Sequence, residues 1–538
     1  MAGDSRPLVA VVGAGSSGLP SIKACIEDGL DVICFEKTDH LGGLWYYTEE
    51  AVPGVGSVAR NTVLNSSKEM SAYSDFPPPA DFPNFMHHSA LLKYLRLYSD
   101  QYGLERYIRY SHKVTAIQPS ADYSATGRWL VQGTDLKTGL PFVALVNAVI
   151  ICSGHNAQPK WPNFPGTRDF KGRVLHAHSY RKAASFEDRA VLVVGLGNSA
   201  GDIATELSYV CSQVHLSTRR GGWVLPRIGR YGRPTDLTLN TRALDTGRRV
   251  LPESAAYRIF ERRLNSAFDH SLYNLRPQHR ALDQQPFVSD VLPSRILSGT
   301  IRIHPNVSRF NADSVVFEDG EQVPVDDVIF ATGYWKHFDF IPMEVAKCVR
   351  EDRVDLYKLI FPARLERPTL AFVGLVDPIG PFWSVAEMQA RYAVAVFSGK
   401  VSLPDVASML GDISRRTKKI AVKSDRYATQ VRWIEYMDDL AFCIGVKPNL
   451  ARMAVSDPIL FLQCFTGPCL PYQFRLGGPH RWEGARDAIM SYEKRVTSAL
   501  SPQTAVNTQM HRAISNAFDF IGSCGLMLFL SYLISLTV

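Results

Sequence analysis

Short apolar runs, a glycine-rich turn and a helical pattern follow one another at the start of the chain. Leu8–Val12 is wholly apolar, which is the pattern of a strand buried on both faces. The turn Gly13–Gly18 comes next, then a helical pattern that includes Ile22 and Ile26, and then a second apolar run, Val32–Phe35. Strand, turn, helix and strand in this order predict a parallel βαβ unit.

The turn of this unit has the spacing GxGxxG, which suits the diphosphate of a dinucleotide. The first glycine permits the tight turn, the second lets the diphosphate approach the backbone, and the third lets the helix pack on the strand. The helix N-terminus offers unpaired N–H donors, and the acid after the second strand accepts hydrogen bonds from a ribose. Pro20 removes one backbone donor, so we expect an irregular first turn of the helix. We predict dinucleotide binding, rather than a bare structural turn, by Gly13, Gly15, Ser16, Ser17, Gly18 and Glu36.

The same pattern recurs later in the chain. Ala190–Val194 is apolar and leads into the turn Gly195–Ala200, a helix from Gly201 to Leu207 and a strand at Val214–Leu216. Alanine is permitted at the close-packing position. This strand ends in hydroxyls and arginines rather than an acid, and such groups bind a 2′-phosphate that an acid would repel. We therefore predict FAD at the first site and NADPH at the second, with a solvated arginine pair as the alternative. The residues predicted for the second site are Gly195, Gly197, Asn198, Ser199, Ala200, Ser217, Thr218, Arg219 and Arg220.

Two stretches between these units carry further candidate contacts. Asp39–Trp45 has paired glycines just beyond the ribose-binding acid, so we place Leu44 and Trp45 against another part of the cofactor, with a plain turn as the alternative. Asn65–Met70 is a polar stretch before a proline-rich loop, and on this pattern alone Asn65 fits a helix cap.

The order of the strands predicts one domain interrupted by another. Ala148–Gly154 and Asp327–Gly333 are strands that end in glycine, and they bracket the second unit. The Arg-rich stretch between that unit and Leu297 is read either as an insertion over a site or membrane, or as a solvated helical face. The fold class is thus α/β, with two Rossmann-like domains for FAD and NADPH, a helical insertion and a C-terminal hydrophobic helix. The boundaries are 1–155 and 331–445 for the FAD domain, 156–221 and 298–330 for the NADPH domain, 222–297 for the insertion, 446–512 for a C-terminal helical region and 513–538 for a membrane anchor.

Composition narrows the functional classes without changing this picture. The 538 residues suggest two or three domains, and a formal charge of +7 without a basic tract gives no sign of a nucleic-acid partner. The nine cysteines are scattered, with no CxxC pair or His/Cys cluster, so no metal site or disulfide framework is predicted. A flavin-linked disulfide reductase, which needs a cysteine pair, is also disfavoured.

The end of the chain is predicted to be a membrane anchor. Phe520–Val538 has no charged residue and is rich in Leu, Phe and Ile. As a helix it spans about 28 Å, close to the hydrocarbon core of a bilayer. The alternatives are a buried terminal helix and a helix on the membrane surface. The first strand begins at Leu8, so we expect no signal peptide and a body in the cytosol.

The segment before the second unit resembles a known family. Phe170–Tyr180 fits the pattern FxGxxxHxxxY, although its aromatics and histidine also suit an ordinary core and loop. This pattern is typical of the flavin-containing monooxygenases of vertebrate endoplasmic reticulum, of the dimethylaniline monooxygenase type. Ser217–Gly222 is most similar to the family member noted for Baeyer–Villiger activity. The resemblance covers nearly the whole chain, including Asn65–Met70, Phe330–Tyr334, Gln389–Arg391, Pro471–Arg475, Trp482–Arg486 and the hydrophobic tail.

The resemblance implies a mechanism and two cofactors, FAD and NADPH. NADPH reduces FAD, O2 adds to give a C4a-hydroperoxyflavin, and a soft nitrogen or sulfur atom of a small lipophilic xenobiotic takes the distal oxygen. It also implies that Asn65 is a catalytic residue beside the flavin and that Thr332 and Gly333 contact cofactor. Ser384 and Tyr392 stand where many relatives have Pro and Trp, and Gly380–Trp383 is bulky. The resemblance therefore does not predict the shape of the substrate channel.

Other functions stay open at this point. Baeyer–Villiger oxidation of ketones to esters uses the same intermediate, and an NADPH oxidase would release H2O2 instead. A non-enzymatic flavoprotein or NADP sensor is the remaining alternative. The resemblance implies attachment to the endoplasmic reticulum membrane with the catalytic body facing the cytosol, and it is compatible with a homo-oligomer.

Overall fold

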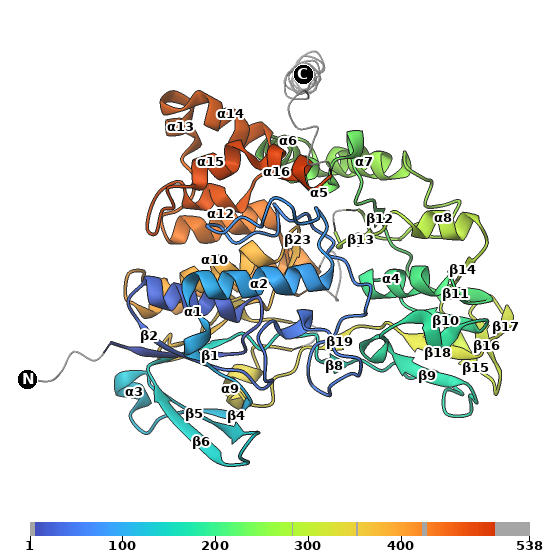
Figure 1. Cartoon of the computed structure of the whole chain (residues 1–538), viewed down its shortest axis with the longest axis horizontal. Helices are drawn as coiled ribbons and strands as arrows, with labels where there is room; N and C mark the ends of the chain where they lie inside the picture. Colours follow the sequence, from blue (N-terminus) through green and yellow to red (C-terminus); the bar gives the residue numbers. More distant parts are fainter. Residues whose placement is uncertain (1–5, 282, 351–352, 422–427, 501–538) are drawn as a thin grey trace, which may run out of the picture.

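The structure is a computed structural model that describes residues 6–281, 283–350, 353–421 and 428–500. The membrane anchor predicted at 513–538 therefore lies outside the described residues. Two parallel β-sheets lie next to each other, and a layer of helices covers the same side of both (Figure 1). The chain is an α/β protein with parallel sheets, as the sequence predicts.

The first sheet is built around the first glycine turn. Its strand order is β22–β7–β1–β2–β3, and all neighbouring pairs are parallel. Helix α1 (Gly18–Glu27) joins β1 to β2, which confirms the predicted βαβ unit. The strands are β1 (Leu8–Val12), β2 (Asp31–Phe35), β3 (Ile108–Arg109), β7 (Ala148–Ile151) and β22 (Leu370–Phe372).

The second sheet is built around the second turn in the same way. Its order is β14–β11–β10–β18–β9, again with parallel neighbours. Helix α4 (Asn198–Leu207) joins β10 to β11. The strands are β9 (Arg173–His176), β10 (Ala190–Val194), β11 (Gln213–Ser217), β14 (Ile301–His304) and β18 (Asp327–Phe330).

The two strands that bracket the second unit do not pair with each other. β7 pairs with β1 in the first sheet, whereas β18 pairs with β10 in the second. In each sheet, the strand before the glycine turn (β1 or β10) therefore has one of these two strands beside it. The last strand of the first sheet, β22, follows all strands of the second sheet in the sequence, so the second sheet interrupts the first domain along the chain.

Helix α1 is continuous through Pro20, so the expectation of an irregular turn there was wrong. Pro20 is the third residue of the helix. The first four N–H groups of a helix have no intrahelical acceptor, so the proline removes no helical hydrogen bond.

Two small antiparallel sheets extend the parallel ones. β4 (His112–Pro119) and β5 (Trp129–Asp135) pair with each other, and β5 also pairs with β6 (Pro141–Val146). β15 (Val307–Phe310), β16 (Ser314–Phe317) and β17 (Gln322–Pro324) form a second meander, which the sequence pattern did not predict.

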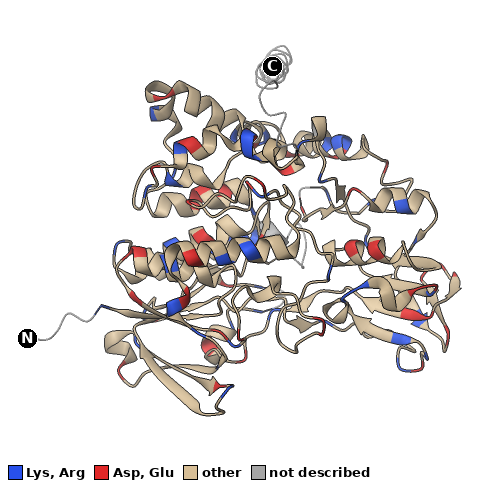
Figure 2. Cartoon of the chain, viewed as in Figure 1, with Lys and Arg blue, Asp and Glu red and all other residues tan. Residues whose placement is uncertain are grey.

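Helices form most of the remaining described chain. Basic and acidic residues are interspersed over the sheets and the helical layer (Figure 2). Within the described ranges, no helix is long and apolar enough to cross a bilayer. The stretch 222–297 contains α5 (Thr235–Leu239), α6 (Arg242–Val250), α7 (Glu253–Asn265) and α8 (Leu292–Leu297), and the other long helices are α2 (His88–Tyr102), α10 (Trp383–Phe397), α11 (Val406–Ala421), α12 (Trp433–Cys443), α13 (Leu450–Ser456), α14 (Pro458–Thr466), α15 (Ala485–Met490) and α16 (Tyr492–Ser498).

Candidate active site

One cavity of about 1710 Å³ brings the two glycine turns together. Its wall combines residues that follow strands of both sheets with residues of α5, α6, α7, α10 and α12. The predicted site residues in this wall are Gly13, Gly15, Ser16, Ser17, Glu36, Leu44, Trp45, Asn65, Asn198 and Ser199. Those outside it are Gly18, Gly195, Gly197, Ala200, Ser217, Thr218, Arg219, Arg220, Thr332 and Gly333.

The first turn has the shape that a bound diphosphate needs. Gly13 has φ +103°, and a Cβ there would lie 2.7 Å from the carbonyl oxygen of Cys152. A Cβ on Gly18 would overlap the carbonyl oxygen of Gly13. Gly15 lies in the cavity wall, and only the backbone of Gly43 comes within 4 Å of the place its Cβ would take. These residues fit FAD, because a glycine backbone faces the cavity beside a helix N-terminus.

Glu36 is buried and braces the same turn. Its Oε2 accepts the Ala14 N–H at 2.7 Å, and its Oε1 accepts the Thr38 N–H at 2.9 Å and the Thr38 hydroxyl at 2.8 Å. A carboxylate offers about four acceptor positions, so one stays free for a ribose hydroxyl. The residue types and positions therefore suit the adenosine end of FAD.

The second turn repeats the backbone of the first. In the first turn the Gly13 N–H donates to the carbonyl oxygen of Phe35, the last residue of β2, at 2.9 Å. In the second turn the Gly195 N–H donates to the carbonyl oxygen of Ser217, the last residue of β11, also at 2.9 Å. Gly195 has φ +123°, and a Cβ there would lie 2.5 Å from a carbonyl oxygen of the neighbouring strand end. Described atoms leave at least 4 Å around the Cβ position of Gly197, which gives the open cradle that a second diphosphate requires.

The four residues predicted to select NADPH at the second site differ in burial and in hydrogen-bond partners. Ser217 is buried, and its hydroxyl donates to the Pro305 carbonyl at 2.7 Å, so it faces away from a nucleotide. Thr218 accepts the N–H of Gly221 at 3.1 Å. Arg219 and Arg220 are exposed at the carboxyl end of β11. The structure thus places only the last three at the expected edge of the sheet.

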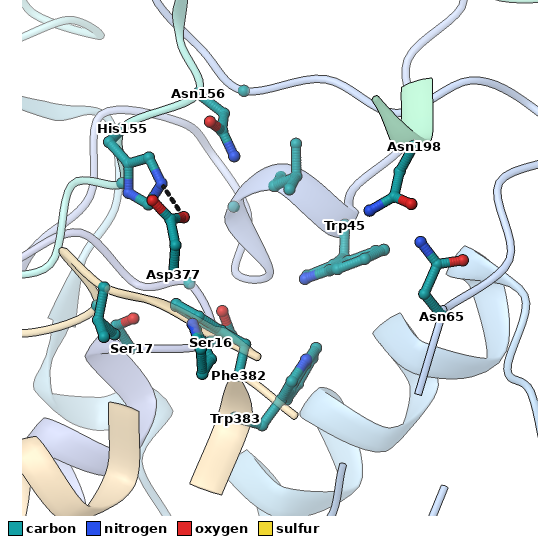
Figure 3. A pocket seen from close by; sticks show the side chains of 18 of the residues that line it. Ser16, Ser17, Trp45, Asn65, His155, Asn156, Asn198, Asp377, Phe382 and Trp383 are labelled. Carbon is teal, nitrogen blue, oxygen red and sulfur yellow. Dashed lines mark ion pairs between the residues drawn. The ribbon is translucent and has the colours of Figure 1, made fainter. Parts of the chain in front are cut away.

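Thr332 and Gly333 lie outside the cavity wall and bind Lys160, which follows the short strand β8 (Gln158–Pro159). The Thr332 hydroxyl donates to the Lys160 carbonyl at 2.5 Å, and the Lys160 N–H donates to the Gly333 carbonyl at 2.9 Å. Leu44 and Trp45 lie in the short helix η1 (Gly43–Trp45), and the Trp45 ring projects into the cavity (Figure 3).

Asn65 lies in an irregular loop and does not cap a helix in the described chain, so the cap interpretation was wrong. Its Oδ1 accepts a hydrogen bond from Arg227 Nη2 at 2.6 Å. Its neighbour in the loop, Ser67, donates its N–H to Asp236 Oδ2 at 2.6 Å. Arg227 and Asp236 both belong to the stretch 222–297, in which the sequence pattern predicts no site residue.

Carboxyl groups with unusual protonation surround this loop. Burial raises the pKa of Asp236 to about 6. Burial also raises the pKa of Asp202 to about 6, against the opposing charge of Arg227. Both groups lie in the cavity wall. Perturbed carboxyls beside a cavity are typical of sites that handle protons.

Asp377 and His155, in the opposite wall, belong to a polar cluster that the sequence patterns did not predict (Figure 3). Asp377 lies 3.5 Å from His155 Nε2 and 3.5 Å from Lys336 Nζ, and it accepts a hydrogen bond from the Thr429 hydroxyl. Burial disfavours the ionised form, but His155 and Lys336 outweigh it and hold the pKa of Asp377 well below its usual range. These four residues are far apart in the sequence, so no local pattern could have revealed the cluster.

The rest of the wall is largely apolar. Leu239, Leu244, Leu251, Ile259 and Phe260 line it from α5–α7 and the adjoining turn. The bulky Gly380–Trp383 stretch also lies in the wall, and the Trp383 ring is tilted against the Trp45 ring with 6.0 Å between their centroids. Such a surface suits a lipophilic compound with few polar groups.

The motif Phe170–Tyr180 lies outside the cavity wall, apart from Ala177. Phe170, His176 and Tyr180 are buried beside the second sheet. A Cβ on Gly172 would overlap the Asp326 carbonyl oxygen. The motif therefore builds the nucleotide domain and is not itself a reactive group.

Comparison with known proteins agrees with this arrangement. The family model described as flavin-binding monooxygenase-like matches residues 6–537. Flavin-containing monooxygenase 5 of Oryctolagus cuniculus is 42% identical over 498 residues, covering 91% of this chain and 93% of that protein. Dimethylaniline monooxygenase [N-oxide-forming] 2 of Mus musculus is 42% identical over 506 residues, with coverages of 92% and 93%.

Solved structures share the fold at lower identity. S-allyl-L-cysteine S-oxygenase from Allium sativum superposes with a TM-score of 0.62 at 22% identity, over 96% of this chain and 99% of that chain. The structure titled OTEMO complex with FAD and NADP gives a TM-score of 0.60 at 15% identity, over 80% and 96%. At these identities the likeness establishes the fold alone.

Proposed function

The chain belongs to the flavin-containing monooxygenase family, and from that premise we propose that it uses NADPH and O2 to oxygenate soft nitrogen or sulfur atoms of small lipophilic xenobiotics. The observation that carries the proposal is a cavity whose wall contains Gly13–Ser17 except Ala14 from the first turn, Asn198 and Ser199 from the second, and Asn65. Two nucleotides held there would meet across one space, which hydride transfer requires.

The residues of the cavity wall and of the two turns have separate roles in this proposal. FAD supplies the redox chemistry when bound, taking a hydride from NADPH and activating O2. The backbone of Gly13–Gly18 binds its diphosphate and Glu36 its ribose. Gly197 and the exposed Arg219 and Arg220 bind NADPH. The aromatic and aliphatic side chains of the wall exclude water from the reacting atoms.

The substrate class follows from the lining of the cavity. The aliphatic and aromatic side chains of α5–α7 offer little to a charged or strongly polar compound. The oxygenation needs a nucleophilic atom on the substrate, so no protein nucleophile is required.

Baeyer–Villiger oxidation of ketones is the second candidate. It is favoured by the resemblance of Ser217–Gly222 to the family member noted for that reaction. Release of H2O2 by an NADPH oxidase is the third, and it is the expected outcome wherever water reaches the reacting atoms.

One assay separates the three. Purified protein with FAD and NADPH receives an aryl methyl thioether, a cyclic ketone or no substrate, and NADPH, H2O2 and product are followed together. We expect sulfoxide to account for most of the NADPH consumed with the thioether. Ester without sulfoxide would reverse the order of the first two candidates. H2O2 equal to NADPH in every arm would exclude both oxygenations.

We also propose that the protein is held at the endoplasmic reticulum membrane with its body in the cytosol, because Phe520–Val538 is apolar and long enough to span a bilayer. Removal of these residues should move the protein from the membrane fraction to the supernatant. Continued sedimentation with lipid would show that another surface provides the attachment.

A further inference from the structure

Figure 3 shows two carboxamides of the cavity wall, Asn65 and Asn198, whose side chains both point into the cavity. A carboxamide presents donors or an acceptor depending on which end points inward. In Figure 3 the amide nitrogens of both residues are directed toward the space near Trp45, and the oxygens point away. The orientation of each amide therefore decides what the site offers to a bound oxygen or carbonyl.

The partners of the two amide oxygens fix this orientation. Asn65 Oδ1 accepts from Arg227 Nη2 at 2.6 Å, and Asn198 Oδ1 accepts from the Val288 N–H at 3.1 Å. A guanidinium has only donors, and so has a backbone N–H, so neither partner tolerates the flipped amide. The NH2 group of Asn65 makes no hydrogen bond to any residue that the structure describes, which leaves both of its protons for a ligand.

Arg227 is itself held in place. Its Nη2 lies 3.9 Å from Asp202, and its Nη1 lies 4.0 Å from Asp290. The Asp290 carboxylate also accepts the Ile228 N–H at 3.0 Å, which ties the backbone next to Arg227 to the same acid. The two carboxylates are more distant than the 2.6 Å amide oxygen, so they flank the guanidinium without replacing its bond to Asn65.

The loop carrying Asn65 is fixed at a second point. Asp236 accepts the Ser67 N–H at 2.6 Å. Val288, Arg227 and Asp236 all come from the stretch 222–297, so one inserted segment holds both the Asn65 loop and the Asn198 amide. The segment therefore does more than cover the cavity, because it also binds two side chains of the cavity wall.

We propose that the inserted segment completes the active site, and that Arg227 is a positioning residue that keeps the NH2 group of Asn65 pointed into the cavity. The inference rests on the proposed function, since it concerns the same site. Without Arg227, the Asn65 amide is free to rotate and to present its oxygen, which repels any acceptor bound there.

The test is a double-mutant cycle between Arg227 and Asn65 in the FAD-loaded enzyme. Arg227→Met keeps most of the side-chain volume and removes the donors, and Arg227→Lys restores one cationic donor. Two quantities are measured for each variant: the ratio of sulfoxide to H2O2 per NADPH consumed, and the dissociation constant of NADP+ from the change in flavin absorbance.

We expect Arg227→Met to lower the sulfoxide-to-H2O2 ratio about tenfold, which is the scale of one charge-assisted hydrogen bond. It should also raise the dissociation constant of NADP+. Arg227→Lys should recover part of both. In the Asn65→Ala background, Arg227→Met should change neither quantity by more than about twofold, because the amide it orients is absent. Arg280→Met is the matched control, since it removes another guanidinium of the same segment whose partner is Glu261.

Two outcomes would overturn the inference. Equal effects of Arg227→Met with and without Asn65 would show that Arg227 acts independently of the amide, as an anchor of the segment. An unchanged ratio and dissociation constant in the single variant, with normal FAD content, would show that the orientation does not matter. Failure of the proposed function is a separate result, namely that the unmodified enzyme forms no oxygenated product.

Discussion

At the scale of single residues, the two glycine turns place different demands on a side chain. A Cβ on Gly18 would overlap the backbone of Gly13, whereas the Cβ position of Gly197 has no described atom within 4 Å. The same motif therefore contains a glycine required for packing and a glycine required for access. The GxGxxG spacing predicts both roles and their positions, because the third residue is expected to pack against the strand and the second to face the diphosphate.

Alanine substitutions should separate these two roles. Gly18→Ala forces the helix away from β1, and we expect it to lower stability by about 1–3 kcal/mol and to reduce FAD retention. Gly197→Ala should change the free energy of unfolding by no more than about 0.5 kcal/mol. It should weaken NADPH binding, because the added methyl group enters the space predicted for the diphosphate. Thermal unfolding, FAD content and NADPH titration distinguish them. Loss of FAD from both variants would show that Gly197 is structural after all.

The residues after β11 give a second residue-scale prediction. Arg219→Ala with Arg220→Ala should weaken NADPH much more than NADH, because the exposed guanidinium groups would pair with the 2′-phosphate. Ser217→Ala is the control, and it should leave the preference unchanged because its hydroxyl is bound to Pro305. The measurement is kcat/KM for each nucleotide. An equal loss of kcat/KM for NADPH and NADH in the arginine variant would contradict the prediction that these arginines bind the 2′-phosphate.

At the scale of elements, a buried ionic cluster attaches the C-terminal region to helices α1 and α10. Arg475 Nη2 lies 3.0 Å from Asp75 and 3.0 Å from Glu387 of α10, and Lys23 of α1 lies 2.6 Å from Asp75. Arg475 and Glu387 are almost fully buried. Charges removed from water in this way are favourable only while they remain paired.

Arg475→Met should therefore destabilise the protein by about 3–5 kcal/mol, because it leaves the Glu387 carboxylate buried without its cation. Glu387→Gln in the same chain should recover part of this loss by removing the orphaned charge. Thermal unfolding of the FAD-loaded variants measures both. A double variant no more stable than Arg475→Met would mean that packing, and not charge, is what the arginine supplies.

Sequence patterns predicted the regular elements better than the contacts between them. The strand at Leu8–Val12 was predicted with its full extent, and the second apolar run, Val32–Phe35, is observed within β2. Apolar runs and helical periodicity are local signals, so they survive without tertiary information. The hydrogen bond from Arg227 to Asn65 spans 162 residues, and no local pattern encodes it. The buried orientation of Ser217 likewise depends on Pro305, which follows a different strand.

At the scale of the whole molecule, the two sheets and the inserted segment act as one site. The first sheet is interrupted by the second, and this topology brings both turns to a common cavity. The sequence predicted two dinucleotide units and the return of the chain to the first. It did not predict that the stretch 222–297 would supply partners to both Asn65 and Asn198, because arginine-rich helical segments are usually solvated faces.

The central claim is that electrons pass from NADPH to a bound flavin and then to O2. The most direct measurement mixes the yellow FAD-loaded protein with an equivalent of NADPH without oxygen, follows the visible flavin absorbance, and then admits air with a thioether present. We predict complete bleaching by NADPH, return of the colour on aeration, and sulfoxide in proportion to the NADPH oxidised. A protein that binds no flavin, or a flavin whose colour NADPH does not change, would contradict the account.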